Sequence, residues 1–260
     1  MRQFGLIGFP LSHSFSKGYF ANHFLTEKIL DAQYENYPIE SIDLFLDLWK
    51  NNPALKGLNV TIPYKKLVIP FLQHPSSIVQ SIQACNCVKL HEGALYGYNT
   101  DVIGFEQSLL PYLQPHHHKA LIFGTGGAAA AVEWVLKKLG IDYQMVSRTA
   151  SEGCISYESL SAEVIEAHTL LIQTSPVGMY PNVDEAPNLP YEAITSKHHL
   201  YNLVYNPAET KFLALGAAQG ATTQNGLEML HLQADASWEI WNSDTPVSYT
   251  HLTLPTILRV

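Results

Sequence analysis

The sequence predicts an α/β protein of two domains with mainly parallel sheets. The chain has 260 residues, which is long for one α/β unit and comfortable for two. Strand-like and helix-like segments alternate along it, as expected of βαβ units. Near its middle, a glycine-rich turn joins an apolar strand to an alanine-rich helix. These three observations together favour two parallel-sheet domains over an all-helical or all-strand fold.

The first hundred residues predict one domain. Strands are expected at 4–9, 34–39 and 58–62, and a helix at 16–28. Ser41 can cap a second helix. Two apolar runs, 87–90 and 95–98, flank His91–Glu92–Gly93 and predict a hairpin.

The second half begins after a Pro- and His-rich segment, 111–118, which we interpret as a surface linker. Strands are predicted at 119–123, 143–147, 170–173 and 200–203, and helices at 128–139 and 226–242. Residues 245–260 carry Pro255 in an apolar run without helical period, so this atypical tail, disordered or non-native, is excluded from the fold. We expect 1–100 with 226–244 to form one domain and 101–225 the other.

Composition excludes several classes. Lys plus Arg is 15 against 23 Asp plus Glu, a formal charge of −8, which disfavours nucleic-acid binding. Three cysteines do not suggest a disulfide framework. No stretch has the apolar length of a membrane span or the core of a signal peptide, so we expect a cytoplasmic protein. The consecutive histidines 116–118 point in different directions, and no metal site is expected.

The glycine-rich turn has the flanks of a Rossmann-like dinucleotide site. Gly124 permits a tight turn, Gly126 lets the backbone approach a pyrophosphate, and Ala129 stands where close helix–strand packing needs a small residue. The helix N-terminus offers free N–H groups to phosphates. The predicted cofactor-binding residues here are Gly124, Thr125, Gly126, Gly127 and Ala128. A purely structural glycine turn is the alternative.

The following strand indicates which dinucleotide is bound. NAD sites usually carry an acidic residue about 20 positions on, at the ribose 2′-hydroxyl. Here the strand ends Ser147–Arg148–Thr149, without an acid. The Arg148 guanidinium can bind a 2′-phosphate, and the two hydroxyls can add hydrogen bonds. The sequence therefore favours NADP over NAD.

Polar residues cluster at strand ends of the first domain. Ser14 and Ser16 lie where a strand gives way to a helix, and either could be a plain N-cap. Asn59 and Thr61 point to one face if the strand is extended, and Lys65 follows just beyond Pro63. Asn86 and the run Asn99–Thr100–Asp101 form a third cluster.

In combination these motifs resemble the shikimate dehydrogenase family along nearly the whole chain to about Asn242. The matching patterns are GxPxxHSxS from Gly8, NVTxPxK from Asn59, AxN at Asn86, NTD at Asp101, GxGGA from Gly124, SRT at Arg148, and a late GxxMLxxQA from Gly226. Thr174 and Tyr205 lie in two further matching segments, TSPVGM and YNLVYNP.

The resemblance implies reversible reduction of 3-dehydroshikimate to shikimate by NADPH, in a cleft between a substrate domain and a Rossmann-like domain. Ser14 and Ser16 would bind the substrate carboxylate, with Tyr205 near it. Lys65 and Asp101 would form the catalytic pair. The remaining expected ligands are Asn59, Thr61, Asn86 and Gln233 for the substrate, and Thr174 and Gly226 for the cofactor.

The chemistry of ketone reduction fits this pair, because an ammonium can stabilise the developing oxyanion and deliver a proton. Departures from the family pattern are Lys17 for Pro, Cys87 for Thr, Ser147 for Asn and Gln173 for Asn. A quinate/shikimate paralogue and a non-catalytic NADP-binding sensor remain alternatives, and either a monomer or a homodimer is expected.

Overall fold

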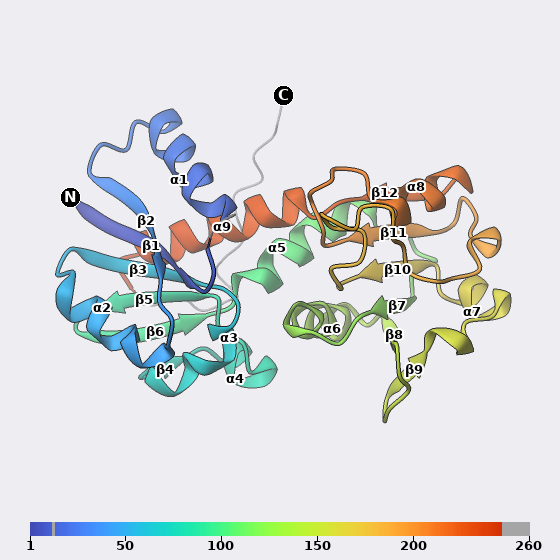
Figure 1. Cartoon of the computed structure of the whole chain (residues 1–260), viewed down its shortest axis with the longest axis horizontal. Coiled ribbons are helices and arrows are strands. Elements are labelled where there is room, and N and C mark those ends of the chain that lie inside the picture. Colours follow the sequence, from blue (N-terminus) through green and yellow to red (C-terminus); the bar gives the residue numbers. More distant parts are fainter. Residues whose placement is uncertain (12–13, 246–260) are drawn as a thin grey trace. The chain divides into compact units, whose positions relative to one another are not determined.

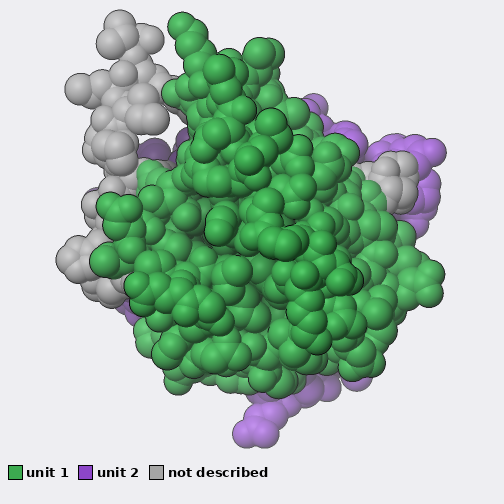
Figure 2. Space-filling model, turned by 90° about the vertical axis from the view of Figure 1, so that its left-hand side faces the viewer, with its two compact units in different colours: residues 1–103, 233–260 green, residues 104–232 purple. Residues whose placement is uncertain are grey.

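The computed structural model describes residues 1–11 and 14–245 (Figure 1). His13, expected to be a structural hydrogen bonder, and the tail beyond residue 245 lie outside the described residues. The chain divides into two compact units (Figure 2). Unit 1 contains residues 1–103 and the segment from 233 onward, and unit 2 contains residues 104–232. The predicted α/β class is confirmed. The domain boundaries expected at residues 100 and 226 stay a prediction.

The sheet of unit 1 has six strands. They are β1 (Arg2–Gly8), β2 (Ala32–Pro38), β3 (Leu55–Val60), β4 (His74–Pro75), β5 (Cys87–His91) and β6 (Ala94–Tyr98), in the order β2-β1-β3-β5-β6-β4. The β1–β2, β1–β3 and β4–β6 pairs are parallel, while β5 is antiparallel to both neighbours. Glu92 and Gly93 both have positive φ, as the predicted two-residue hairpin turn requires.

Apolar side chains cover both faces of this sheet. Phe4 and Tyr34 pack with Phe20 of helix α1 (Phe15–Thr26) and Trp241 of α9 (Leu227–Asn242). The opposite face is covered by α2 (Phe45–Asn51), α3 (Tyr64–Leu67) and α4 (Ser77–Ile82), through a core that includes Ile7, Phe45, Leu58, Tyr64 and Val79. Five consecutive residues of β1 are buried, as expected of a strand covered on both faces.

The sheet of unit 2 is entirely parallel among its described pairs. Its strands are β7 (Lys119–Phe123), β8 (Asp142–Ser147), β9 (Cys154–Ser156), β10 (Leu170–Gln173), β11 (His199–Asn202) and β12 (Thr222–Gln224). The order is β12-β11-β10-β7-β8-β9. From β7 the chain first adds β8 and β9 on one side and then β10, β11 and β12 on the other, so the strand order reverses between β7 and β10. Such a switch point is where open α/β sheets bind ligands.

The helices of unit 2 are α6 (Gly127–Leu139), α7 (Ala162–Ala167) and α8 (Lys211–Ala218). Helix α5 (Thr100–Leu109) and helix α9 each contribute residues to both units. Short 3-10 turns occur at Ile42–Leu44, Ile69–Phe71, Leu110–Tyr112, Tyr157–Ser159 and Tyr191–Ala193. No helix in the described ranges is long and apolar enough to cross a membrane.

The histidine-rich segment lies mostly at the surface, as predicted, with His117 as its one buried residue. The Nδ1 atom of His117 accepts from the Gln114 N–H, and its Nε2 lies 3.1 Å from the Lys197 carbonyl. The His117 ring therefore ties the segment to the loop that precedes β11.

Candidate active site

The amine of Lys65 and the carboxylate of Asp101 meet in unit 1. Lys65 lies on α3, directly after the Ile62–Pro63 turn, and Asp101 lies in the first turn of α5. The distance from Lys65 Nζ to Asp101 Oδ2 is 2.6 Å, with side-chain exposures of 26% and 14%. Both groups thus stay within reach of a ligand while sharing a charge-assisted hydrogen bond.

Asn86 holds the other oxygen of this carboxylate. Its Nδ2 donates to Asp101 Oδ1 at 2.9 Å and to Thr100 Oγ1 at 3.0 Å, and its Oδ1 accepts from the Thr100 N–H at 2.6 Å. Asn86 is 3% exposed. Since both amide hydrogens are occupied by protein atoms, the Asn86 side chain fixes the orientation of Asp101.

Asn59 and Thr61 lie at the carboxyl end of β3, next to this cluster. Asn59 is buried, whereas Thr61 stands one residue past the strand and is partly exposed. The Thr61 N–H donates to the carbonyl of Ile7 at 2.9 Å. This backbone bond continues the β1–β3 pairing, so the Thr61 side chain is set beside the end of β1.

Ser14 and Ser16 begin α1, and both are partly buried. Ser14 occupies the N-cap position, yet its hydroxyl makes no capping bond, and its buried Oγ has no hydrogen-bond partner among the described residues. A buried polar group without a partner is unfavourable unless a ligand completes it. The plain N-cap interpretation therefore fails for Ser14.

Gln233 reaches the same cluster from α9, with its Oε1 3.4 Å from Thr100 Oγ1. Sequence reasoning missed Tyr34, Thr100 and Ser237, which bond to the predicted residues. Thr100 could have been found from its place inside the NTD motif. Ser237 lies one helical turn after Gln233, so its spacing on α9 was the available signal. Tyr34 carries no sequence signal beyond that of a buried strand residue.

The glycine-rich turn of unit 2 follows β7 at the switch point. Gly124 has φ +117°, a conformation that favours glycine, and a Cβ there would lie 2.8 Å from Thr174 Oγ1 at the end of β10. Beside Gly126 and Gly127, in contrast, a Cβ would meet open space. The N-cap of α6 has no side-chain bond, so the first N–H groups are available to an anion.

The remaining predicted cofactor residues surround strand ends of unit 2. Ser147 Oγ donates to the Thr149 carbonyl at 2.6 Å, and Arg148 is exposed just past β8. Thr174 Oγ1 donates to the Phe123 carbonyl at 3.0 Å.

Two more predicted residues lie in unit 2. Gly226 is buried where any Cβ would collide with the Leu203 carbonyl, so only glycine fits there. Tyr205, partly exposed, follows β11 in the same unit. Arg148 and the glycine turn therefore share one unit with Tyr205, and the Lys65–Asp101 pair belongs to the other.

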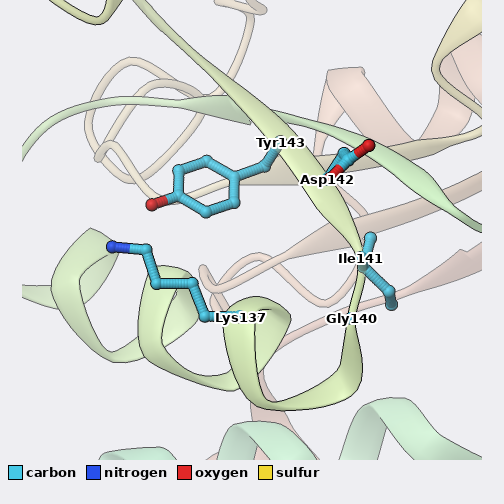
Figure 3. Close-up of a pocket in the computed structure, with 5 residues that line it drawn as sticks. All are labelled: Lys137, Gly140, Ile141, Asp142 and Tyr143. Carbon is cyan, nitrogen blue, oxygen red and sulfur yellow. The ribbon is translucent and has the colours of Figure 1, made fainter.

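A separate surface hollow lies at the C-terminal end of α6, away from the glycine turn. It is lined by Lys137, Gly140, Ile141, Asp142 and Tyr143. Figure 3 shows the Lys137 amine on the same side of the hollow as the Tyr143 ring. Lys137 Nζ is 5.6 Å from that ring's centroid. None of these residues was predicted to bind a ligand. Within the described ranges, no group of three or more His, Cys, Asp or Glu side chains is arranged to hold a metal ion.

The strand order of unit 2 and its uncapped glycine turn define a dinucleotide-binding α/β protein, and the Lys65–Asp101 pair adds the acid–base groups of a dehydrogenase. Residues 6–88 match the family model described as the shikimate dehydrogenase substrate binding domain. The NADP(+) shikimate dehydrogenase of Methanosphaera stadtmanae is 32% identical over 263 positions, covering 93% of this chain and 92% of that protein. The chain belongs to the shikimate dehydrogenase family.

Two solved structures agree with this assignment. A chorismate mutase/shikimate 5-dehydrogenase fusion protein from Clostridium acetobutylicum superposes with a TM-score of 0.83 at 32% identity, covering 95% of this chain and 92% of that one. Shikimate 5-dehydrogenase from Thermus thermophilus, solved with NADP(H) and shikimate, gives a TM-score of 0.82 at 30% identity, covering 95% of each chain.

Proposed function

We propose that this protein is a shikimate dehydrogenase, which reversibly reduces 3-dehydroshikimate to shikimate with NADPH in chorismate and aromatic amino acid biosynthesis. One observation carries the proposal: Lys65 Nζ and Asp101 Oδ2 are 2.6 Å apart, and both side chains keep some exposure. Relatives named NADP(+) shikimate dehydrogenases, and a related structure that holds NADP(H) and shikimate, support the substrate and the cofactor.

The substrate carboxylate binds Ser14 and Ser16, and Tyr205 is a further proposed substrate ligand. The unpartnered, buried Ser14 hydroxyl supports this role, because a carboxylate oxygen would accept its hydrogen. Thr61 and Gln233 hold the ring hydroxyls. Asn59 and Asn86 belong to the same site. Their amide hydrogens already bond to protein atoms, which favours support of the ligand-binding groups over direct donation to substrate.

When bound, the nicotinamide cofactor supplies the hydride. Lys65 stabilises the negative charge that develops on the substrate oxygen and donates the proton that completes the hydroxyl group. In the reverse direction the same amine accepts that proton. Asp101 orients the Lys65 ammonium and accepts a hydrogen bond from a substrate hydroxyl.

The residues present fit NADP. The uncapped N-terminus of α6 and the open space beside Gly126 and Gly127 suit a pyrophosphate. Exposed Arg148 and the Thr149 hydroxyl receive the 2′-phosphate, and Ser147, whose hydroxyl donates to the Thr149 carbonyl, holds this turn of the cofactor site. The residues that complete the cofactor site are Gly124, Thr125, Ala128, Thr174 and Gly226. The enzyme acts in the cytoplasm as a monomer or homodimer.

A steady-state assay tests the proposal, with shikimate and quinate each offered with NADP⁺ and NAD⁺ and turnover followed at the absorbance band of the reduced nicotinamide. We expect turnover of shikimate with NADP⁺. Lys65→Ala should lower kcat far more than it raises the KM for shikimate. A near-normal kcat in that variant would falsify the role of Lys65, and preference for quinate would favour the quinate/shikimate paralogue. No turnover of either substrate would favour a non-catalytic NADP-binding sensor.

A further inference from the structure

The carboxamide of Asn59 is fully engaged by protein groups. Its Nδ2 donates to Ser237 Oγ at 2.9 Å and to the Asn86 carbonyl at 3.3 Å. The carbonyl of Asn86 can only accept, so the nitrogen must face it, and Oδ1 is left to accept from the Tyr34 hydroxyl at 2.9 Å. Asn59 is 5% exposed. Both amide hydrogens are therefore used within the protein, and Asn59 acts as a junction between its neighbours.

Tyr34 connects this junction to the start of α1. Its ring is buried and stacks on Phe20, with centroids 4.4 Å apart, so the position of the hydroxyl is fixed. Ser16 also lies within hydrogen-bonding reach of that hydroxyl, and burial holds the pKa of Tyr34 well above its ordinary value. The phenol keeps its proton at any physiological pH and remains a donor to Asn59.

Ser237 connects the junction to the opposite end of the site. It is fully buried on α9, and its Oγ donates to the Gln233 carbonyl at 2.9 Å. Since the single hydroxyl hydrogen is used there, Oγ accepts from Asn59. Ser237 Oγ and Thr100 Oγ1 are 3.2 Å apart, and Thr100 bonds in turn to Asn86.

We propose that Tyr34 and Ser237 are positioning residues for the substrate, acting through Asn59 to hold Ser16, Gln233 and the Asn86–Asp101 pair at a fixed spacing. The geometry that carries this inference is one continuous set of contacts from Phe20 of α1, the helix that begins at Ser14 and Ser16, through Tyr34, Asn59, Ser237, Thr100 and Asn86 to Asp101. The inference rests on the proposed function, because Ser16 is there assigned to the substrate carboxylate and Asp101 to a substrate hydroxyl.

Unit 2 provides matched controls. Ser108 is also a fully buried helical serine whose Oγ donates to the carbonyl four residues earlier, at 2.7 Å, and it pairs with the buried hydroxyl of Tyr201 at 2.7 Å. Tyr34→Phe and Ser237→Ala remove one hydroxyl each from the network. Tyr201→Phe and Ser108→Ala remove chemically equivalent hydroxyls outside it.

The experiment measures kcat and the KM values for shikimate and NADP⁺ for all four variants, together with urea unfolding midpoints. We expect Tyr34→Phe and Ser237→Ala to raise the KM for shikimate about tenfold, the effect of one lost hydrogen bond of about 1.4 kcal/mol. Their kcat should fall less, and their KM for NADP⁺ should not change. The control variants should lose comparable stability and keep the wild-type KM for shikimate.

Wild-type turnover of shikimate is measured first, so failure of the proposed function is seen before any variant is compared. Given that turnover, the inference is overturned if the network variants match their controls in the KM for shikimate. It is also overturned if both network variants fail to fold while the controls fold, because the two hydroxyls would then serve stability alone.

Discussion

Asn86 and Asp101 are joined by a hydrogen bond of 2.9 Å between Nδ2 and Oδ1, while the second oxygen of the same carboxylate meets Lys65. The carboxylate is therefore fixed on both sides, by a neutral amide and by a cation. Such a clamp removes rotational freedom from Asp101, and a preorganised group needs no rearrangement when substrate binds. The negative charge also keeps the Lys65 ammonium directed at one place.

Replacing the charge of Asp101 should therefore impair chemistry more than folding. Asp101→Asn keeps the volume and removes the ion pair, and we expect kcat to fall by about 10²-fold or more. Asp47→Asn is the matched control, since Asp47 forms an exposed pair with Lys50 at 3.0 Å. Steady-state kinetics with saturating NADP⁺ measure both. Equal kcat values for the two variants would show that Asp101 has no part in turnover.

Cofactor choice should depend on Arg148. Arg148→Ala removes the cation expected at the 2′-phosphate, so kcat/KM for NADP⁺ should drop by about 10- to 100-fold, and kcat/KM for NAD⁺ should stay the same. The NAD⁺ assay serves as the internal control. Equal kcat/KM values for NADP⁺ and NAD⁺ in the unmutated enzyme would contradict the expected preference for NADP⁺.

Two glycines of the same turn should respond differently to alanine. Gly124 has φ +117° and would place its Cβ against Thr174, so Gly124→Ala should cost about 1–3 kcal/mol of stability and lower the Tm. Gly126 opens onto free space, so Gly126→Ala should cost less than about 1 kcal/mol, the range for an N-cap change, yet weaken NADP⁺ binding. Thermal unfolding and dinucleotide titration separate the two effects. Unaltered binding in Gly126→Ala would argue against pyrophosphate contact at this turn.

Acid should destabilise unit 2 through His199. Burial lowers its pKa to about 4 in the folded protein from an ordinary 6.5, with the charge of His117 adding to the shift. The unfolded chain therefore binds the proton more readily. The contribution of neutral His199 to the free energy of unfolding is fully present above pH 6.5 and is lost as the pH falls toward 4. We expect the free energy of unfolding to drop by about 2 kcal/mol between pH 7 and pH 5.

His199→Asn provides the comparison for this pH dependence. Asn can still bond to Thr222, which lies 2.8 Å from Nδ1 of the histidine, but it does not titrate. Urea unfolding at the two pH values should show a smaller loss of stability in the variant than in the wild type. An identical loss in both proteins would assign the acid sensitivity to other groups.

Sequence patterns predicted the long, buried elements well. The strands at β7 and β10 were predicted to the residue, because continuous apolar runs between turn signals identify buried strands. Helix α5 was missed because the NTD motif at its start was interpreted only as a polar cluster. The three-residue strands β9 and β12 are too short to show any period.

The site could be predicted only in part. Motifs singled out Lys65 and Asp101 as the expected catalytic pair, and the structure brings these two side chains together. Tyr34 and Ser237 could not be found in this way, since their proposed role rests on contact with Asn59, which lies 25 and 178 positions away along the chain. A hydrogen bond across such separations depends on tertiary packing and leaves no local pattern.

Unit 1 is assembled from both ends of the chain, and this order matters during synthesis. Trp241 stacks on Phe4 at 4.9 Å and fills the space left by Gly57, so the first sheet lacks a large part of its cover until α9 has left the ribosome. A nascent chain that has emerged only as far as unit 2 must keep that apolar surface exposed to the surrounding solution. Chaperone association with ribosome-bound intermediates should therefore persist until the last helix emerges and docks.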